Sequence, residues 1–316
     1  MEIHVRKTKR ASRSGKVFAR EDIGFLAGLP VLAIVALLVP EKRWRVVCAW
    51  LERLRRVPLH DAGANRDLAA FGLDSRADWR RIGAARSEHN IQILRERLVG
   101  WRPEIELHGV EHLDAAREEG HGAVLWIGHF AFNALAAKMA FARAGFEVFH
   151  VSRPEHGFSK SRFGIRYLNP IRTSAELGYA AGRIVIDRAD PAASMNEARR
   201  LLRLNKFVSI TAGAWEGDLL VDARIGDSVI ALAGGAPRLA RIAQAPLLPV
   251  FVLRDDNSGR ILVIVERPVH LERSQDKIEI VKGAAQDFAD RHLPYLKAFP
   301  HQWRGWEKLA AAETPR

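Results

Sequence analysis

Short apolar runs alternate with helical patterns between residues 104 and 268. The runs are EIELHGV, AVLWIG, EVFHVS, RIVI, KFVSITA, PLLPVFVL and RILVIVERP. Helical patterns separate several of them, at 133–143, 194–204 and 237–244. Strands that are apolar on both faces and alternate with helices are typical of a parallel sheet covered on both sides. We therefore predict an α/β fold with a mostly parallel sheet flanked by helices.

Two neighbouring segments refine this prediction. The last two apolar runs are joined by RDDNSGR, whose Asp, Asn, Ser and Gly residues favour a tight turn. This turn predicts a hairpin, so one strand pair should be antiparallel. Residues 77–100 precede the first strand and have the pattern of one long amphipathic helix.

The N-terminal end has a different organisation. Residues 1–22 form a basic tail, and the stretch from Ile23 to Val39 contains no charged residue. As a helix it would be roughly 26 Å long at about 1.5 Å per residue, which is marginal for a hydrocarbon core of about 30 Å. Basic residues flank it on both sides, and a basic helical pattern with Trp44 and Trp50 follows. Such a helix suits an anionic bilayer surface. Residues 23–57 are therefore predicted to be a membrane-anchoring or interfacial segment, and a helix packed on the globular domain is the alternative.

The net charge of +12 favours anionic partners: phospholipid head groups, an acidic carrier protein or nucleic acid. A single cysteine, Cys48, excludes an internal disulfide and favours a reducing compartment. The histidines show no metal-ligand spacing. The sequence also has no P-loop, no G-x-G-x-x-G after a strand, no G-x-S-x-G elbow and no recognisable nucleic-acid-binding module.

His129 stands where the AVLWIG strand ends and a helix begins. Open parallel sheets bind ligands beyond the carboxyl ends of their strands. An imidazole there can accept a proton from a hydroxyl, which can then attack an acyl carbonyl. Asn133, one helical turn onward, could hold the ring but supplies no negative charge. A structural or capping histidine is the alternative interpretation.

The order of several segments resembles the late lipid A acyltransferase family, part of the lysophospholipid acyltransferase superfamily. The segments that carry the resemblance are GHFAFNA, HVSRPEHGF, RIVIDRAD, ALAGGAPRLARIAQAPLLPVFV and FPHQWRGWEKL. Members of this family move a fatty acyl chain from acyl carrier protein or coenzyme A to a lipid hydroxyl. The resemblance implies an acyltransferase-like α/β domain over residues 58–305, followed by a C-terminal tail at 306–316.

The resemblance also implies roles for individual residues. It implies His129 as general base, with Asn133 beside it, and Arg162, Arg166 and Arg188 as groups that hold anionic parts of the substrate. A solvated basic face is the alternative for the arginines. The acyl donor is acyl carrier protein or coenzyme A, and no other cofactor is expected. Acyl carrier protein and membrane lipids are the expected partners, without nucleic acid, at the cytoplasmic face of the inner membrane.

The chain departs from the family pattern at two places. The family has an acidic residue five positions after the histidine, where this chain has Ala134. The family often has Asp-Gln where this chain has Gly213-Ala214, although Glu216 and Asp218 follow closely. Loss of the carboxylate that supports a catalytic imidazole typically lowers the rate by orders of magnitude. The alternative function is therefore a weakened homologue that binds lipid or acyl carrier protein without efficient transfer.

Overall fold

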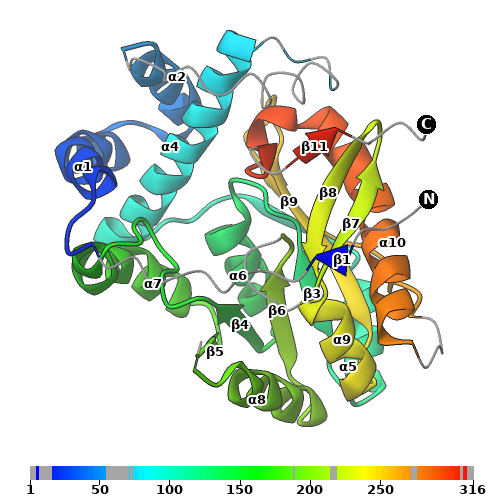
Figure 1. Cartoon of the computed structure of the whole chain (residues 1–316). Helices are drawn as coiled ribbons and strands as arrows, with labels where there is room; N and C mark the ends of the chain where they lie inside the picture. The colour runs from blue at the N-terminus through cyan, green and yellow to red at the C-terminus, as the bar shows by residue number, and fades with distance from the viewer. Residues whose placement is uncertain are drawn as a thin grey trace.

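The computed structural model describes residues 5–6, 16–54, 71, 73, 75–187, 189–213, 219–271, 276–306 and 309–311. A seven-stranded sheet with strand order β2-β10-β9-β3-β6-β4-β5 forms its centre (Figure 1). The strands of this sheet are β2 (Ile105–His108), β3 (Val124–Ile127), β4 (Val148–Ser152), β5 (Gly182–Val185), β6 (Phe207–Thr211), β9 (Leu247–Arg254) and β10 (Ile261–Val265).

Five neighbouring strands, β9, β3, β6, β4 and β5, run parallel to one another. β10 is antiparallel to β9 and parallel to β2, so these last two strands point the other way. The predicted mostly parallel sheet and the predicted antiparallel hairpin are both confirmed. As a result, the carboxyl ends of β3, β4, β5, β6 and β9 share one edge of the sheet, and that of β2 lies at the opposite edge.

Helices cover both faces of the sheet, as the apolar strands predicted. On β3, Val124 and Trp126 belong to a core packed with α8 (Pro191–Arg203), α9 (Gly235–Ala243) and α10 (Lys277–Ala298). Leu125 and Ile127 belong to a second core on the other face, with α5 (Val110–Glu118), α6 (Asn133–Arg143) and α7 (Asn169–Leu177). All four side chains are buried, because both faces of β3 are covered.

A smaller antiparallel sheet, with order β1-β7-β8-β11, lies beside α10 (Figure 1). Its strands are β1 (Val5–Arg6), β7 (Leu220–Ile225), β8 (Ser228–Ala233) and β11 (Leu309–Ala311). The sequence patterns did not predict this sheet. β1 lies within the predicted basic tail and β11 within the predicted C-terminal tail, and each pairs its backbone with a strand of this sheet.

The N-terminal helices are α1 (Arg20–Leu38), the short 3-10 helix η1 (Glu41–Arg43), α2 (Trp44–Leu54) and α4 (Ser75–Val99). One side of α1 and one side of α2 pack against α4. Leu32 and Val35 of α1, with Trp44 and Cys48 of α2, belong to the same hydrophobic core as the buried residues of α6. The remaining side of both helices is exposed. Within the described residues, no helix combines the length and the apolar character needed to cross a membrane.

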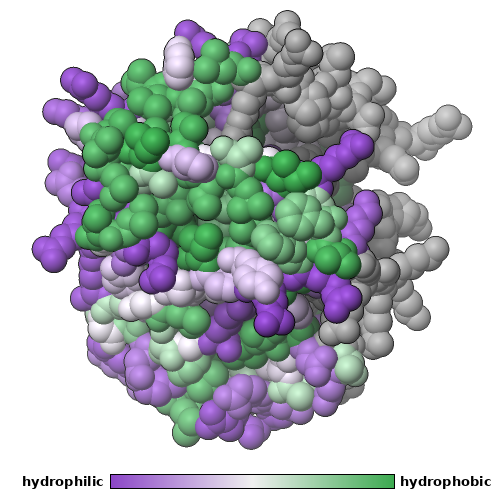
Figure 2. All heavy atoms as spheres, turned by 90° about the vertical axis from the view of Figure 1, so that its left-hand side faces the viewer, coloured by the Kyte–Doolittle hydropathy of each residue, from purple (hydrophilic) through white to green (hydrophobic). Residues whose placement is uncertain are grey.

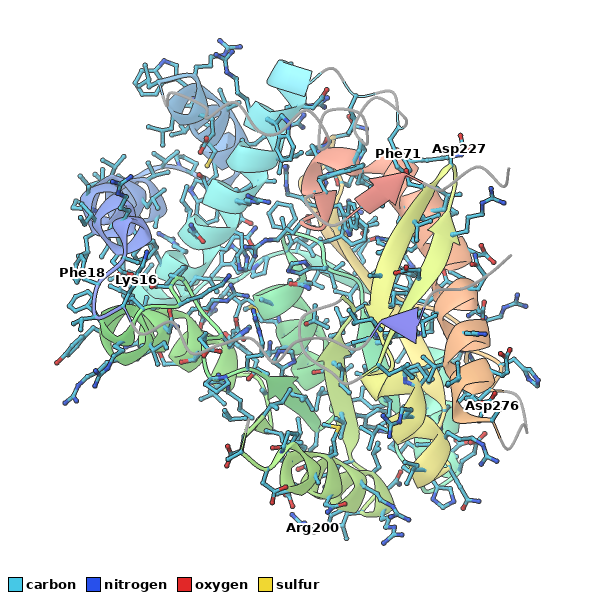
Figure 3. The ribbon with its side chains drawn as sticks, in the orientation of Figure 1. Lys16, Phe18, Phe71, Arg200, Asp227 and Asp276 are labelled. Atoms are coloured by element: carbon cyan, nitrogen blue, oxygen red, sulfur yellow. The ribbon has the colours of Figure 1, made fainter. Side chains whose placement is uncertain are left out.

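The start of α1 is fixed to a segment far away in the sequence. Asp22 is fully buried, and its carboxylate accepts hydrogen bonds from Ser161 Oγ at 2.6 Å and from the Ala19 amide at 2.7 Å. The amide of Arg162 donates to the carbonyl of Lys16 at 3.2 Å. Burial alone would raise the pKa of Asp22, but these hydrogen bonds outweigh it and lower the pKa. Figure 3 labels Lys16 and Phe18 at this junction.

Candidate active site

His129 follows Gly128 at the carboxyl end of β3, the middle strand of the seven-stranded sheet. A Cβ atom on Gly128 would lie 2.8 Å from Phe251 Cδ1 and 3.3 Å from Phe130 Cδ2, so only glycine fits between these rings. The chain then turns at once into α6. The side chain of His129 is half-buried. The local sequence thus delivers an imidazole to the edge of the sheet where the predicted site lies.

The C-terminal segment 299–306 holds the loop that carries His129. The Ala131 amide donates to the carbonyl of Gln302 at 2.7 Å, and the Arg304 amide donates to the carbonyl of His129 at 3.0 Å. Phe130 and Trp303 form an isolated antiparallel bridge. The tight 3-10 turn η3 (Pro300–Gln302) positions these groups. The FPHQWRGW segment therefore has a structural function: it fixes the loop after β3.

Asn133 and Ala134 begin α6. Asn133 is buried, and its Nδ2 donates to the carbonyl of Gly128 at 3.1 Å. Asn133 therefore shapes the loop, and its role beside the imidazole stays a prediction. The carbonyl of Ala134 accepts a hydrogen bond from Lys138 Nζ at 2.7 Å. Ala134 occupies the position that is acidic in the family that the sequence resembles, and its backbone carbonyl contacts a buried lysine.

Lys138 belongs to a buried charge cluster centred on Glu176 of α7. The Glu176 carboxylate contacts Lys138 Nζ at 2.9 Å, Arg172 Nε at 2.7 Å and His156 Nε2 at 2.9 Å. Burial alone would raise the pKa of Glu176, but its cationic partners and the hydrogen bond from His156 hold the pKa well below its usual range. The Glu176 carboxylate of α7 is therefore linked, through Lys138, to the first turn of the helix that follows His129.

A second buried network joins α4 to the end of β9. Arg254 Nε lies 3.1 Å from Glu88 Oε1, and Arg254 Nη2 lies 3.3 Å from Asp256 Oδ1. Asp256 also contacts His301 Nε2 at 3.2 Å. The Arg254 guanidinium lies 5.3 Å from the centre of the Phe132 ring, in the His129 loop. Burial raises the pKa of Glu88 to about 7 in spite of Arg254. This network links the helical unit to the candidate site.

Of the arginines predicted to bind substrate, the structure describes Arg162 and Arg166, and both are exposed. Arg162 precedes the π-helical turn η2 (Gly164–Leu168), Arg166 lies within it, and this segment lies beside the start of α1. The Arg166 guanidinium lies 5.5 Å from the centre of the Tyr167 ring. Arg188, Glu216 and Asp218 lie outside the described residues. The structure therefore groups Arg162 and Arg166 with the exposed side of the N-terminal helices, and their substrate role stays a prediction.

The sequence patterns missed His156, Arg172 and Glu176. A signal was present for His156, which follows the carboxyl end of β4 as His129 follows that of β3. Arg172 lies one turn before Glu176 on α7, but the other two partners of Glu176, Lys138 and His156, come from other elements and leave no local signal. Within the described ranges, no three His, Cys, Asp or Glu side chains gather in a way that could hold a metal ion.

No protein-family model matches the chain, and no curated protein sequence matches it. Among solved structures, it is similar to the crystal structure of the 1-acyl-sn-glycerophosphate (LPA) acyltransferase PlsC from Thermotoga maritima, at 12% identity and a TM-score of 0.39. The match covers 88% of this chain and 98% of the other.

Proposed function

We propose that this chain is a membrane-associated acyltransferase that moves a fatty acyl chain from acyl carrier protein or coenzyme A to a lipid hydroxyl. The observation that carries the proposal is the position of His129, half-buried at the carboxyl end of β3, the middle strand of the seven-stranded sheet. Ligands of open α/β sheets bind at this edge. The sequence resemblance to late lipid A acyltransferases supports the choice of acyl transfer.

In the proposed reaction, His129 accepts the proton of the acceptor hydroxyl. The hydroxyl oxygen attacks the thioester carbonyl, so that a C–O bond forms and the C–S bond breaks. The leaving thiolate then takes the proton from the imidazolium. His129 ends the cycle neutral, and no covalent enzyme intermediate is formed. The net charge of +12 suits an acidic acyl carrier protein as donor.

The exposed side of α1 and α2 supports a membrane location. Figure 2 shows a broad hydrophobic area on the side of the molecule where these helices lie, bordered by hydrophilic residues. The exposed apolar side chains on α1 and α2 are Ile23, Leu26, Val31, Ile34, Leu37, Leu38, Val46, Trp50 and Leu54. Exposed basic residues near them are Lys16, Arg20, Lys42, Arg43, Arg53, Arg162 and Arg166. An apolar area with a basic border suits an anionic bilayer, so we place the protein at the cytoplasmic face of the inner membrane.

The activity is tested with the full chain in detergent. We expect labelled acyl groups to move from acyl carrier protein or coenzyme A to a total lipid extract. His129→Ala should lower the rate at least about 100-fold, since a general base typically contributes that much. His108→Gln is the matched control, because His108 lies at the end of β2, on the opposite edge of the sheet. No transfer by the native chain, or full activity of His129→Ala, would contradict the proposal.

The membrane location has its own test. We expect the chain to float with vesicles that contain anionic phospholipid, less strongly at high salt, and not with neutral vesicles. Ile34→Ser with Trp50→Ser should abolish flotation, whereas Leu204→Ser, an exposed apolar residue just past α8, should not. The alternative function is a weakened homologue, which Ala134 favours. Vesicle binding without acyl transfer is the outcome that supports this alternative.

A further inference from the structure

Four titratable side chains form one cluster of ion pairs near the edge of the sheet that carries His129. They are Lys138, His156, Arg172 and Glu176. The side chains of Lys138, Arg172 and Glu176 are between 4% and 9% exposed, whereas 19% of the His156 side chain is exposed. Removing charges from water is costly, and a buried ion network is weak evidence for added stability. Clusters of perturbed titratable groups are enriched at functional sites. This cluster therefore needs a functional explanation.

The cluster fixes the tautomer of His156. Glu176 is ionised and can only accept hydrogen bonds, so His156 Nε2 carries the proton and donates it, at 2.9 Å to Oε2 and 3.1 Å to Oε1. Nδ1 is then left with its lone pair, and no described residue donates a hydrogen bond to it. Burial lowers the pKa of His156 to about 4. Glu176 acts to raise this pKa, but the positive charges of Arg172 and Lys138 act in the opposite direction. The ring is thus a neutral acceptor across the physiological range.

The loop that carries His156 is held in one conformation. Asn169 accepts hydrogen bonds from the amides of Phe158 and Ser159 at 2.8 and 2.9 Å. Gly157 has φ of +152°, and a Cβ atom there would lie 2.3 Å from Asn169 Cγ. The amide of His156 itself donates to the carbonyl of Arg153 at 3.1 Å. A half-buried polar ring held this firmly is preorganised to bind a ligand.

His156 lies at the same edge of the sheet as His129. Only β6 separates β3 from β4, so the two strands are roughly 10 Å apart. The cluster also contacts the helix that follows His129, through Lys138 Nζ on the carbonyl of Ala134. Other charged or titratable groups around the ring are His150, at 5.5 Å between ring centres, and Arg183, whose Nη2 donates to the carbonyl of Arg153 at 2.8 Å.

We propose that His156, held by Glu176, binds a hydroxyl group of the acceptor lipid through Nδ1 and so selects the acceptor. This inference rests on the proposed acyltransferase function. His129 remains the base that removes the proton of the attacking hydroxyl. A site that is built to pair with a hydroxyl discriminates strongly against ligands that lack it.

Kinetics test the proposal. His156→Phe should raise the KM for the acceptor in the lipid extract about ten-fold or more, with a smaller change in kcat and in the KM for the acyl donor. His156→Gln, whose carboxamide oxygen can accept a hydrogen bond, should recover part of the loss. His108→Gln is the control. If acceptor KM stays unchanged in His156→Phe, or if the KM values for acceptor and donor rise equally, the assignment is wrong.

A chemical probe separates this inference from the proposed function. Diethyl pyrocarbonate modifies neutral, accessible imidazole nitrogens, and mass spectrometry identifies the modified residue. We expect His156 to react at similar rates at pH 6 and pH 8, unlike an ordinary histidine with pKa near 6.5. Vesicles of the lipid extract should slow the reaction at least about five-fold at His156 but not at His108. Absence of this protection overturns the inference. Protection in a chain that transfers no acyl group would refute only the proposed function.

Discussion

Gln302 forms a two-bond clamp on the backbone of Arg254: Oε1 accepts from its amide at 2.8 Å, and Nε2 donates to its carbonyl at 2.7 Å. Gln302 is fully buried, and its own carbonyl accepts from the amide of Ala131. One residue therefore connects the end of β9, through its side chain, and the loop of His129, through its backbone, to the C-terminal turn η3. Several measurable consequences follow from contacts of this kind.

Gln302→Ala should lower the free energy of unfolding by about 2–4 kcal/mol, because it leaves a buried amide and a buried carbonyl of Arg254 unpaired. Urea unfolding followed by circular dichroism measures this. Gln286 offers a matched control, since it clamps the amide and carbonyl of Arg224 at 2.9 Å each in an exposed setting. Gln286→Ala should cost less than about 1 kcal/mol, because water replaces the lost partners. Equal losses would contradict this account.

Gly128→Ala should destabilise the protein by about 1–3 kcal/mol, because the new methyl group would overlap the buried ring of Phe251. It should also displace His129 and reduce acyl transfer. Gly283→Ala is the control: the glycine lies exposed inside α10 with no atom within 4 Å of the added Cβ. There we expect a gain of about 0.5–1 kcal/mol. Thermal unfolding of the two variants distinguishes the effects, and similar signs for both would refute the packing argument.

Glu88 makes stability depend on pH. Its pKa is raised from 4.5 to about 7 in the folded protein, so the folded state binds the proton more tightly than the unfolded state. The stabilising contribution is complete below pH 4.5 and is lost as the pH rises through about 7. Glu88→Gln should remove this dependence, so its stability relative to the native chain rises between pH 5 and pH 8. The total change is on the order of 3 kcal/mol. A pH-independent difference would show that Glu88 titrates normally.

Asp22→Ala should release the start of α1 from the segment around Ser161. Alanine removes Oδ2, which accepts hydrogen bonds from both Ser161 Oγ and the Ala19 amide, so the buried serine hydroxyl loses its 2.6 Å partner. We expect a loss of about 1–3 kcal/mol and faster amide hydrogen exchange at residues 16–24. Exchange in α8 should stay unchanged and serves as the internal reference. Equal acceleration in both regions would indicate global destabilisation instead.

The central sheet was predictable because its strands carry their signal locally. β3 and β9 are buried on both faces and are therefore apolar at nearly every position. The smaller sheet was missed because Asp222 and Arg224 interrupt β7, and because β1 and β11 are short and pair with strands far away in the sequence. α10 was missed as well; it contains Gly283 and Pro294, residues that normally weaken a helical pattern.

The residues of the candidate site were likewise predictable only where the sequence carries a local signal. His129 was predictable because a buried strand, a glycine and a helix start follow one another in the sequence. Glu176 was not, because two of its three partners, Lys138 and His156, come from segments far away in the sequence. The substrate role of Arg162 and Arg166 came from the family resemblance alone, and the structure places them beside α1.

The bond between Ser161 and Asp22 joins residues 139 positions apart. At a synthesis rate of about 5–20 residues per second, the segment around Ser161 leaves the ribosome roughly ten seconds after the first helix. During that interval the apolar residues of the helix lack the partner that later fixes its start. We therefore expect a chaperone or a lipid surface to cover the apolar side of this helix before its partner is made.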